Sequence, residues 1–463
     1  MISRRPTVPV LAILWVLAAG PTLCVGTPLA ASDPLRALVD EALARNTALS
    51  ASRLAERRAA AEHTAAITRW LPAVSLETRA SRLHDVQDLG DFVNPAYAAL
   101  NQLSGSNAFP SDLSLTLPRA YESHVRVTQP LVHESLRASV ALAGAQRDAE
   151  REAHHAAARR LAADVQVAWL DAASASRVVE IQESALELVR ENERVAERLL
   201  AAGRVTPEAV HRARADRATV EQALADAHEQ RLAATRELNR LAGRPLHAAP
   251  ESLPDSVFES PMTLTADDVV RSALAGREEL AQASAGARAA RAGVRAASGT
   301  FLPRVSGAFD LAWQGDEWTL DRADRSWTAS LVASWDLFRG GSDLALRTAA
   351  RAEAERAGAL ARDASERVTV EVLAAHEAAR VAYDAVATAR TRAEAARRTY
   401  TLVHRRFQEG SATPLELTEA RTQQTAAETN QALTLYRSAV RRVQLERAAA
   451  LRDLPFTTKG ARP

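Results

Sequence analysis

Apolar residues recur along this chain with two different spacings, and the switch between them separates expected helices from expected strands. Over residues 34–70 the apolar positions follow the three-to-four spacing of a helix face. Directly after Pro72 and Pro303, apolar and polar residues alternate with a period of two, as along a strand with one apolar face. Because proline cannot continue a helix and the residue before it favours an extended backbone, each proline predicts a helix end followed by a strand. We therefore expect one helix over 34–70 and a corresponding one over 265–301.

Each half of the chain also contains a second alternating segment, at 121–131 in the first half and at 327–337 in the second. Segments of about ten residues, apolar on one face and polar on the other, are typical of outer-membrane β-barrels. The alternative is a soluble sandwich with one buried face, which an export signal and long helical hairpins do not favour. We expect four tryptophans of the second half to mark a lipid interface: Trp313, Trp318, Trp327 and Trp335.

The loop between the two strands is longer in the first half than in the second. It contains the segment 94–100, NPAYAAL, which predicts one short helix. Longer loops of outer-membrane barrels lie on the outside of the cell, so we expect this loop there.

Two very long helices are predicted, at 135–202 and at 342–409. At 1.5 Å per residue, each is on the order of 100 Å long. A shorter helix follows each of them, at 207–241 and at 414–451. Each pair therefore predicts a long helical hairpin.

The tips of the two hairpins carry matching residues at an offset of 207 positions. Gly203 corresponds to Gly410, and a Thr-Pro pair follows three residues later in both copies. Glycine can take a positive φ and end a helix, threonine is a good N-cap, and proline is favoured at the first position of the next helix. The repetition predicts a tandem duplication.

The expected fold class is mainly α with a β portion, built from two copies of helix, two strands and a long helical hairpin. Four strands cannot close a barrel, and an open sheet edge is not tolerated in lipid, so the chain must oligomerise. Two copies supply 8 strands and three supply 12, which leaves room for a lumen. The expected segments are a signal peptide (1–31), a first repeat (32–242), a connector (243–262), a second repeat (263–452) and a disordered tail (453–463).

The first residues have the pattern of an export signal. Arg4 and Arg5 precede an apolar run at 8–19, and small residues follow. The only cysteine, Cys24, lies in this segment. A lipoprotein signal is the alternative to an ordinary signal peptide, but Leu23 fits poorly where a small residue is needed. No later stretch reaches the roughly 20 apolar residues of a spanning helix, so any insertion into a membrane must use strands.

Composition and charge exclude several function classes. The formal net charge of +1 gives no basis for nucleic-acid binding. We find no nucleophile–base pair, no phosphate-binding glycine loop and no clustered metal ligands, and we expect no enzymatic activity, cofactor or metal. His154 and His155 are adjacent, so a helix directs them about 100° apart, which favours a solvated helix face over a metal site.

With these elements in place, the chain resembles the outer membrane efflux proteins, the TolC-like channels, over about residues 33–451. The resemblance rests on the doubled Leu-Pro junctions at 70–72 and 301–303, the strand-to-helix junctions at 129–131 and 335–341, and the repeated tips. The segment 132–135 departs from the family, which often has Phe and a Gly pair there.

The resemblance implies a homotrimer in the outer membrane of a Gram-negative bacterium. It implies a 12-stranded β-barrel in the membrane and a 12-helix α-barrel reaching into the periplasm. The periplasmic tips would dock onto an adaptor protein bound to an inner-membrane pump, and substrates would leave through the lumen. The channel itself would make and break no bonds.

The family also suggests site residues near the tips. Its acidic constriction lies six and nine positions after the second tip glycine, where this chain has Glu416 and Glu419, while the first tip has Ala209 and Arg212. The alternative is that these glutamates are ordinary charges at a helix N-terminus, where acids are favoured. The expected adaptor-docking residues, for which turn chemistry alone is the alternative, are Gly203, Val205, Thr206, Pro207, Gly410, Ala412, Thr413 and Pro414.

Two functions of other classes remain open. One is a periplasmic adaptor, which also carries coiled-coil hairpins but usually only one, and which is soluble without detergent. The other is a periplasmic structural coiled coil, which forms no conducting pore. The sequence does not separate drugs, metal ions and polypeptides as cargo.

Overall fold

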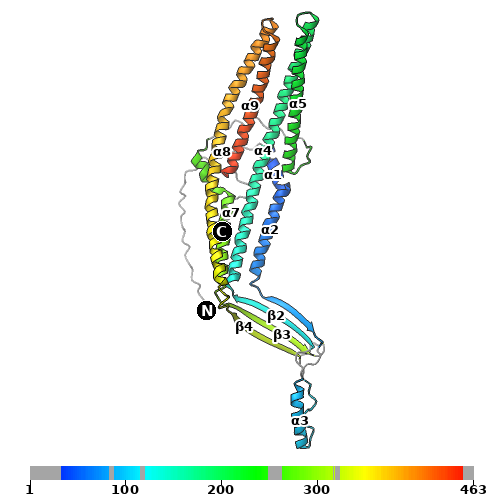
Figure 1. Cartoon of the computed structure of the whole chain (residues 1–463), viewed down its shortest axis with the longest axis vertical. Coiled ribbons are helices and arrows are strands. Elements are labelled where there is room, and N and C mark those ends of the chain that lie inside the picture. Colours follow the sequence, from blue (N-terminus) through cyan, green and yellow to red (C-terminus); the bar gives the residue numbers. More distant parts are fainter. Residues whose placement is uncertain are drawn as a thin grey trace, which may run out of the picture.

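The computed structural model describes residues 33–82, 88–114, 120–248, 263–315, 318 and 324–451. The expected signal peptide and tail, and residues 249–262 of the expected connector, lie outside the described residues. The molecule is elongated, with two helical hairpins at one end, a sheet beyond the helical body and a separate helix at the far end (Figure 1). No described helix combines the length and the apolar character that crossing a membrane requires.

The hairpins form as the sequence predicts. In each hairpin the long helix exceeds 65 residues, and the return helix lies beside it (Figure 1). The first hairpin consists of α4 (Glu134–Ala201) and α5 (Pro207–Ala242), and the second of α8 (Ser342–Gln408) and α9 (Pro414–Ala448).

The helix expected over each of 34–70 and 265–301 is in fact two helices, so this prediction is wrong in both halves. The four helices are α1 (Asp33–Arg45), α2 (Thr47–Thr68), α6 (Ala266–Gly276) and α7 (Glu278–Gly299). The breaks fall at Asn46 (φ −64°, ψ 125°) and Arg277 (φ −73°, ψ 124°), which both have extended backbones.

Both breaks have the same physical cause, a side chain that binds the end of a return helix. The Asn46 Nδ2 donates to the Leu241 carbonyl at 3.0 Å, and the Arg277 Nη1 donates to the Ala448 carbonyl at 3.0 Å. Carbonyls in the last turn of a helix have no partner within that helix, so these bonds satisfy them. Asn46 also caps α2 by accepting from the Leu49 amide at 3.1 Å.

The strands form one antiparallel sheet in the order β1-β2-β3-β4, and the pairing of β2 with β3 joins the two halves of the chain. Val127 lies opposite Val74 on one side and Phe309 on the other. The strand expected over 327–337 begins and ends earlier, and the Trp335 indole donates to the Phe301 carbonyl at 3.1 Å instead of continuing the strand. The strands are β1 (Ala73–Ala80), β2 (Tyr121–Val132), β3 (Arg304–Gly315) and β4 (Arg325–Ser334).

Large apolar side chains of the sheet are exposed in the single chain. β1 and β4 are exposed at every position, and among the described residues no second sheet covers them. A soluble sandwich is therefore not the architecture of this part of the chain. Trp327 stacks on Phe309 with ring centroids 6.2 Å apart, and Trp318 lies 6.0 Å from Tyr121. Trp318, Trp327 and Trp335 are exposed, while Trp313 is half-buried.

The helix in the loop between β1 and β2 is longer than expected. It is α3 (Gly90–Ser104), and Gly105 ends it with a φ of +61°. Two asparagines of α3 bind the returning chain through both side-chain atoms: Asn94 pairs with the Leu113 backbone, and Asn101 pairs with the Phe109 backbone, at 2.7–2.9 Å. These long-range bonds stabilise a helix that local sequence predicts only over 94–100.

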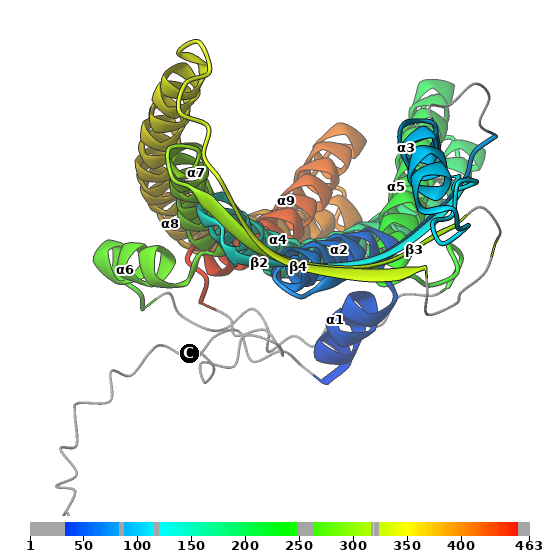
Figure 2. The same cartoon turned by 90° about the horizontal axis from the view of Figure 1, so that it is seen from below.

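The core lies in the middle of the helical body, with one cluster in each half and a third where α4 and α9 meet. Trp169 is fully buried where α1, α2, α4 and α5 meet, among residues such as Leu38, Val165 and Leu238. A second cluster, which includes Val269, Val372 and Leu445, lies where α6, α8 and α9 meet. Viewed end-on, the helices and the sheet follow one curved layer with α1 and α6 on the same side of it (Figure 2).

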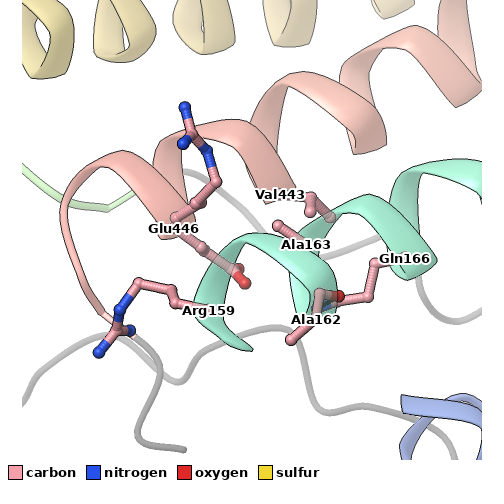
Figure 3. Close-up of a pocket in the computed structure, with 7 residues that line it drawn as sticks. Arg159, Ala162, Ala163, Gln166, Val443 and Glu446 are labelled. Carbon is pink, nitrogen blue, oxygen red and sulfur yellow. Dashed lines mark hydrogen bonds between the residues drawn. The ribbon is translucent and has the colours of Figure 1, made fainter. Parts of the chain in front are cut away.

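A buried ion pair connects the two halves. The Arg159 guanidinium of α4 donates to both carboxylate oxygens of Glu278 in α7, at 2.7–2.9 Å. Beside it, between α4 and α9, lies a cavity of about 20 Å³ lined by Gln166 and Glu446 (Figure 3). This volume is enough for about one water molecule.

Candidate functional site at the hairpin tips

The two tips have the same backbone turn. Gly203 and Gly410 take φ values of +69° and +74°, a region that residues with a side chain rarely enter. The amide of the next residue bonds to a carbonyl five residues back in each copy, Arg204 to Leu199 at 2.9 Å and Ser411 to Arg406 at 2.8 Å. This is the Schellman arrangement, and it explains why the duplicated tips share their glycine.

The helices that leave the two tips are capped differently. Thr413 accepts from the Glu416 amide at 3.2 Å, and its own amide donates to Glu416 Oε2 at 2.7 Å, which forms a reciprocal capping box. Thr206 has almost the same backbone angles but makes no side-chain cap bond, and Ala209 occupies the position of Glu416. Only the second tip is therefore held by a carboxylate.

Both candidate constriction residues are exposed in the single chain. The hydrogen bond from the Thr413 amide lowers the pKa of Glu416, and the Thr413 hydroxyl and the nearby Arg406 add to this effect. Arg406 Nη2 lies 3.9 Å from Glu416 Oε1. Glu416 thus caps the N-terminus of α9, and its carboxylate is ionised at neutral pH.

Acidification is expected to loosen the second tip more than the first. Because the folded-state pKa of Glu416 is lowered, its stabilising effect is fully present above the ordinary glutamate pKa of about 4.3 and is lost as the pH falls through the lower folded value. The measurement is the exchange protection of the Thr413 and Glu416 amides, corrected for intrinsic rates, between pH 6 and pH 3.

Glu416→Gln is the matched control, because glutamine keeps a hydrogen-bond acceptor at this position but does not titrate. Protection of these two amides in this variant is expected not to depend on pH. An equal loss of protection in this variant, or at residues 206–209 of the first tip, would contradict the assignment to Glu416.

The candidate docking residues lie at the turns of the two hairpins, four at each tip. The two tips form one end of the molecule (Figure 1). The docking residues are mostly exposed, and only Val205 and Ala412 are half-buried. A Cβ added at Gly203 or Gly410 would meet no atom within 4 Å, so the turn leaves open space around both glycines. The remaining residues of this set, all exposed, are Thr206, Pro207, Thr413 and Pro414.

A cavity of about 260 Å³ lies between the two hairpins, behind the tips. Sequence reasoning did not find it, because its walls come from both hairpins. α4 contributes Val189 and Leu199, α5 contributes Asp216, and α9 contributes Leu417 and Arg421.

Arg421 is the unusual residue of this inter-hairpin cavity. It is only 5% exposed, and its Nη2 lies 3.7 Å from Asp216 Oδ2, which is too far for a hydrogen bond. Its Nη1 is buried and has no hydrogen-bond partner among the described residues. Burial lowers the pKa of the guanidinium, and the charge of Asp216 opposes this effect. A buried donor without a partner costs about 1–3 kcal/mol, and more when it is charged.

The equivalent arginine of the first hairpin has a different environment. Arg214 is exposed and forms ion pairs with Glu193 at 3.3 Å and Glu197 at 2.8 Å. The local sequence gives no signal for the difference, because Arg214 follows the buried Val210 by four positions just as Arg421 follows the buried Leu417.

His154 and His155 lie on α4, and both are half-buried, which differs from the expected solvated helix face. Ser52 Oγ lies 2.8 Å from His154 Nδ1, and burial lowers the pKa of this histidine. Across the described ranges, no three side chains of His, Cys, Asp or Glu are grouped so as to hold a metal ion.

Comparison with known proteins shows which family this chain belongs to. A model of the outer membrane efflux protein family matches residues 38–244 and 269–451, which together are most of the chain. No curated protein sequence matches the chain.

Several solved structures share the fold at low identity. CusC superposes with a TM-score of 0.77 at 16% identity, covering 91% of this chain and 93% of CusC. VceC of Vibrio cholerae has a TM-score of 0.72 at 17% identity, with coverages of 90% and 95%. The outer membrane channel MtrE of Neisseria gonorrhoeae, in its open state, has a TM-score of 0.71 at 19% identity, with coverages of 90% and 88%.

Proposed function

Because this chain belongs to the outer membrane efflux protein family, we propose that it forms the outer-membrane exit duct of a tripartite efflux or type I secretion system. The observation that carries the proposal is the joining of a four-stranded sheet with exposed apolar side chains to helical hairpins on the order of 100 Å long. A sheet in lipid that continues into a helical wall gives a path from the periplasm to the outside.

The proposed assembly is a homotrimer. β1 and β4 are the edges of the sheet, and in lipid such edges must be paired. Three copies would pair edge to edge into a closed barrel of 12 strands, with the curved helical layer of each copy as one segment of the tube wall (Figure 2). Trp318, Trp327 and Trp335 are exposed near the sheet, where they would lie at the lipid interface.

The tips are proposed to dock onto a periplasmic adaptor that is bound to an inner-membrane pump. The tip residues are small and most of them are exposed, so the hairpin of a partner can approach closely. The duct then needs no reaction of its own, because the pump supplies the energy. An adaptor or a purely structural coiled coil is less well supported, because neither uses a sheet whose large apolar side chains are exposed.

Glu416 and Glu419 are proposed to line the constriction of the pore. Both are exposed and lie one helix turn apart on α9. Threefold repetition would place rings of carboxylates around the axis, an arrangement that favours cations in a pore. The lowered pKa of Glu416 keeps its ring charged at neutral pH.

Single-channel recording in a planar bilayer tests the duct and the constriction together. The wild-type trimer is expected to be cation-selective in a salt gradient. Glu416→Gln with Glu419→Gln is expected to reduce the reversal potential by about half or more, because the ring charge is lost while glutamine can keep the cap. Glu208→Gln, an exposed acid in the first turn of α5, is the matched control and should change little.

The outcomes separate the two parts of the proposal. An unchanged reversal potential in the double variant keeps the duct and removes the glutamates from the constriction. Absence of current from a verified trimer, both as wild type and with the capping box removed by Thr413→Ala, would contradict the duct.

A further inference from the structure

The inter-hairpin cavity has the size and the lining of a small-molecule site. Its volume of about 260 Å³ is just below the roughly 300–1,000 Å³ of ordinary ligand pockets. Val189 and Leu417 are buried, and Leu199 is half-buried, so much of the wall is apolar. A ligand here would have a compact apolar body.

The charges at the cavity indicate which polar group that body carries. Four charged side chains line it: Arg421 and Arg212 are cationic, and Asp216 and Glu208 are anionic. Arg212 and Glu208 are exposed and remain hydrated, whereas Arg421 is buried. The nearest carboxylate, Asp216, is beyond hydrogen-bond distance and leaves Arg421 with unused donors. The group that is missing from the cavity is therefore a hydrogen-bond acceptor for Arg421. A planar anion such as a carboxylate matches the geometry of a guanidinium best.

We propose that the inter-hairpin cavity binds a small amphipathic organic acid, with its carboxylate accepting from the Arg421 guanidinium and its apolar body between Val189, Leu199 and Leu417. This site lies between the hairpins of one chain and uses neither Glu416 nor Glu419. It also does not depend on the proposed duct, because binding is measured directly.

Binding at this site would connect the two hairpins. The acid would contact α4 of the first hairpin and α9 of the second, beside the 3.7 Å ion contact between Asp216 of α5 and Arg421 of α9. Occupied, the cavity therefore favours the arrangement in which the two tips are close together.

The test is equilibrium dialysis of 2-naphthoate against the purified protein held in an amphipathic polymer. We expect saturable binding of one molecule per chain. Its uncharged isostere, 2-naphthamide, is expected to bind at least about tenfold more weakly, because it cannot form the charge-assisted bond. This comparison uses the wild-type protein alone, so it does not depend on the folding of any variant.

Two variants and a matched control locate the site. Arg421→Gln is expected to weaken 2-naphthoate binding about tenfold or more, and Ala196→Phe, which fills the cavity from α4, is expected to abolish it. Arg214→Gln, the same change at the exposed equivalent position, is expected to leave binding unchanged. No saturable binding to wild type, equal binding of the acid and the amide, or unchanged binding to both Arg421→Gln and Ala196→Phe would each overturn the proposal.

Discussion

Trp169→Ala is expected to lower the free energy of unfolding of the helical body by about 3–5 kcal/mol. The indole is fully buried where α1, α2, α4 and α5 meet, so its removal leaves a cavity that four helices must share. Helices fixed at several points collapse only partly into such a space, and the loss of contacts adds to the lost burial. The measurement is urea unfolding followed by helical circular dichroism at one fixed protomer concentration.

A series at this position tests the mechanism. Trp169→Leu removes less volume and is expected to cost less than Trp169→Ala, because the cost of a core truncation rises by roughly 24 cal/mol per Å³ of residual cavity. Equal losses for the two variants would indicate a lost specific interaction of the indole instead of a cavity.

Glu278→Leu is expected to destabilise the protein by about 3–5 kcal/mol, because it leaves the Arg159 charge buried without the carboxylate that pairs with it. The guanidinium makes three hydrogen bonds to Glu278, and both residues are less than 10% exposed. The pair also connects α4 of the first half to α7 of the second, so its loss is expected to loosen the contact between the halves. Thermal and urea unfolding of the variant measure the effect.

A double variant distinguishes the cost of leaving one charge buried from the contribution of the whole ion pair. Arg159→Met combined with Glu278→Leu is expected to recover most of the loss, because an apolar pair of similar volume has no buried charge to compensate. Glu180→Leu removes the partner of Arg177 in an exposed pair and is the matched control, with an expected change of about 0–1 kcal/mol. A double variant as unstable as Glu278→Leu alone would contradict this account.

The elements that the sequence predicts well are those specified by nearby residues. The Leu-Pro junctions, the tip glycines and the Thr-Pro pairs act within one turn of the chain, and all of them form as expected. The helix breaks at Asn46 and Arg277 were missed because their causes are distant. The carbonyls that these side chains bind lie 195 and 171 residues away in the sequence.

In the candidate site, too, features specified by nearby residues are predictable from the sequence, and features that need both hairpins are not. The capping box at Thr413 follows a local pattern, a threonine with a glutamate three residues later, and could have been predicted. The inter-hairpin cavity could not, because Arg421 and Asp216 meet only when the hairpins lie side by side. Arg214 and Arg421 hold equivalent positions in the duplicated tips, yet one is exposed and the other buried, so the local pattern does not distinguish them.

The pairing of β2 with β3 also determines when the sheet can be completed. Val127 and Phe309 are opposite each other in the sheet but about 180 residues apart in the chain. The first hairpin can form without the second half, because the contacts between α4 and α5 lie within the first half. The β1–β2 ribbon, in contrast, keeps an unpaired edge until β3 lies beside it, and an unpaired edge can pair with a wrong strand.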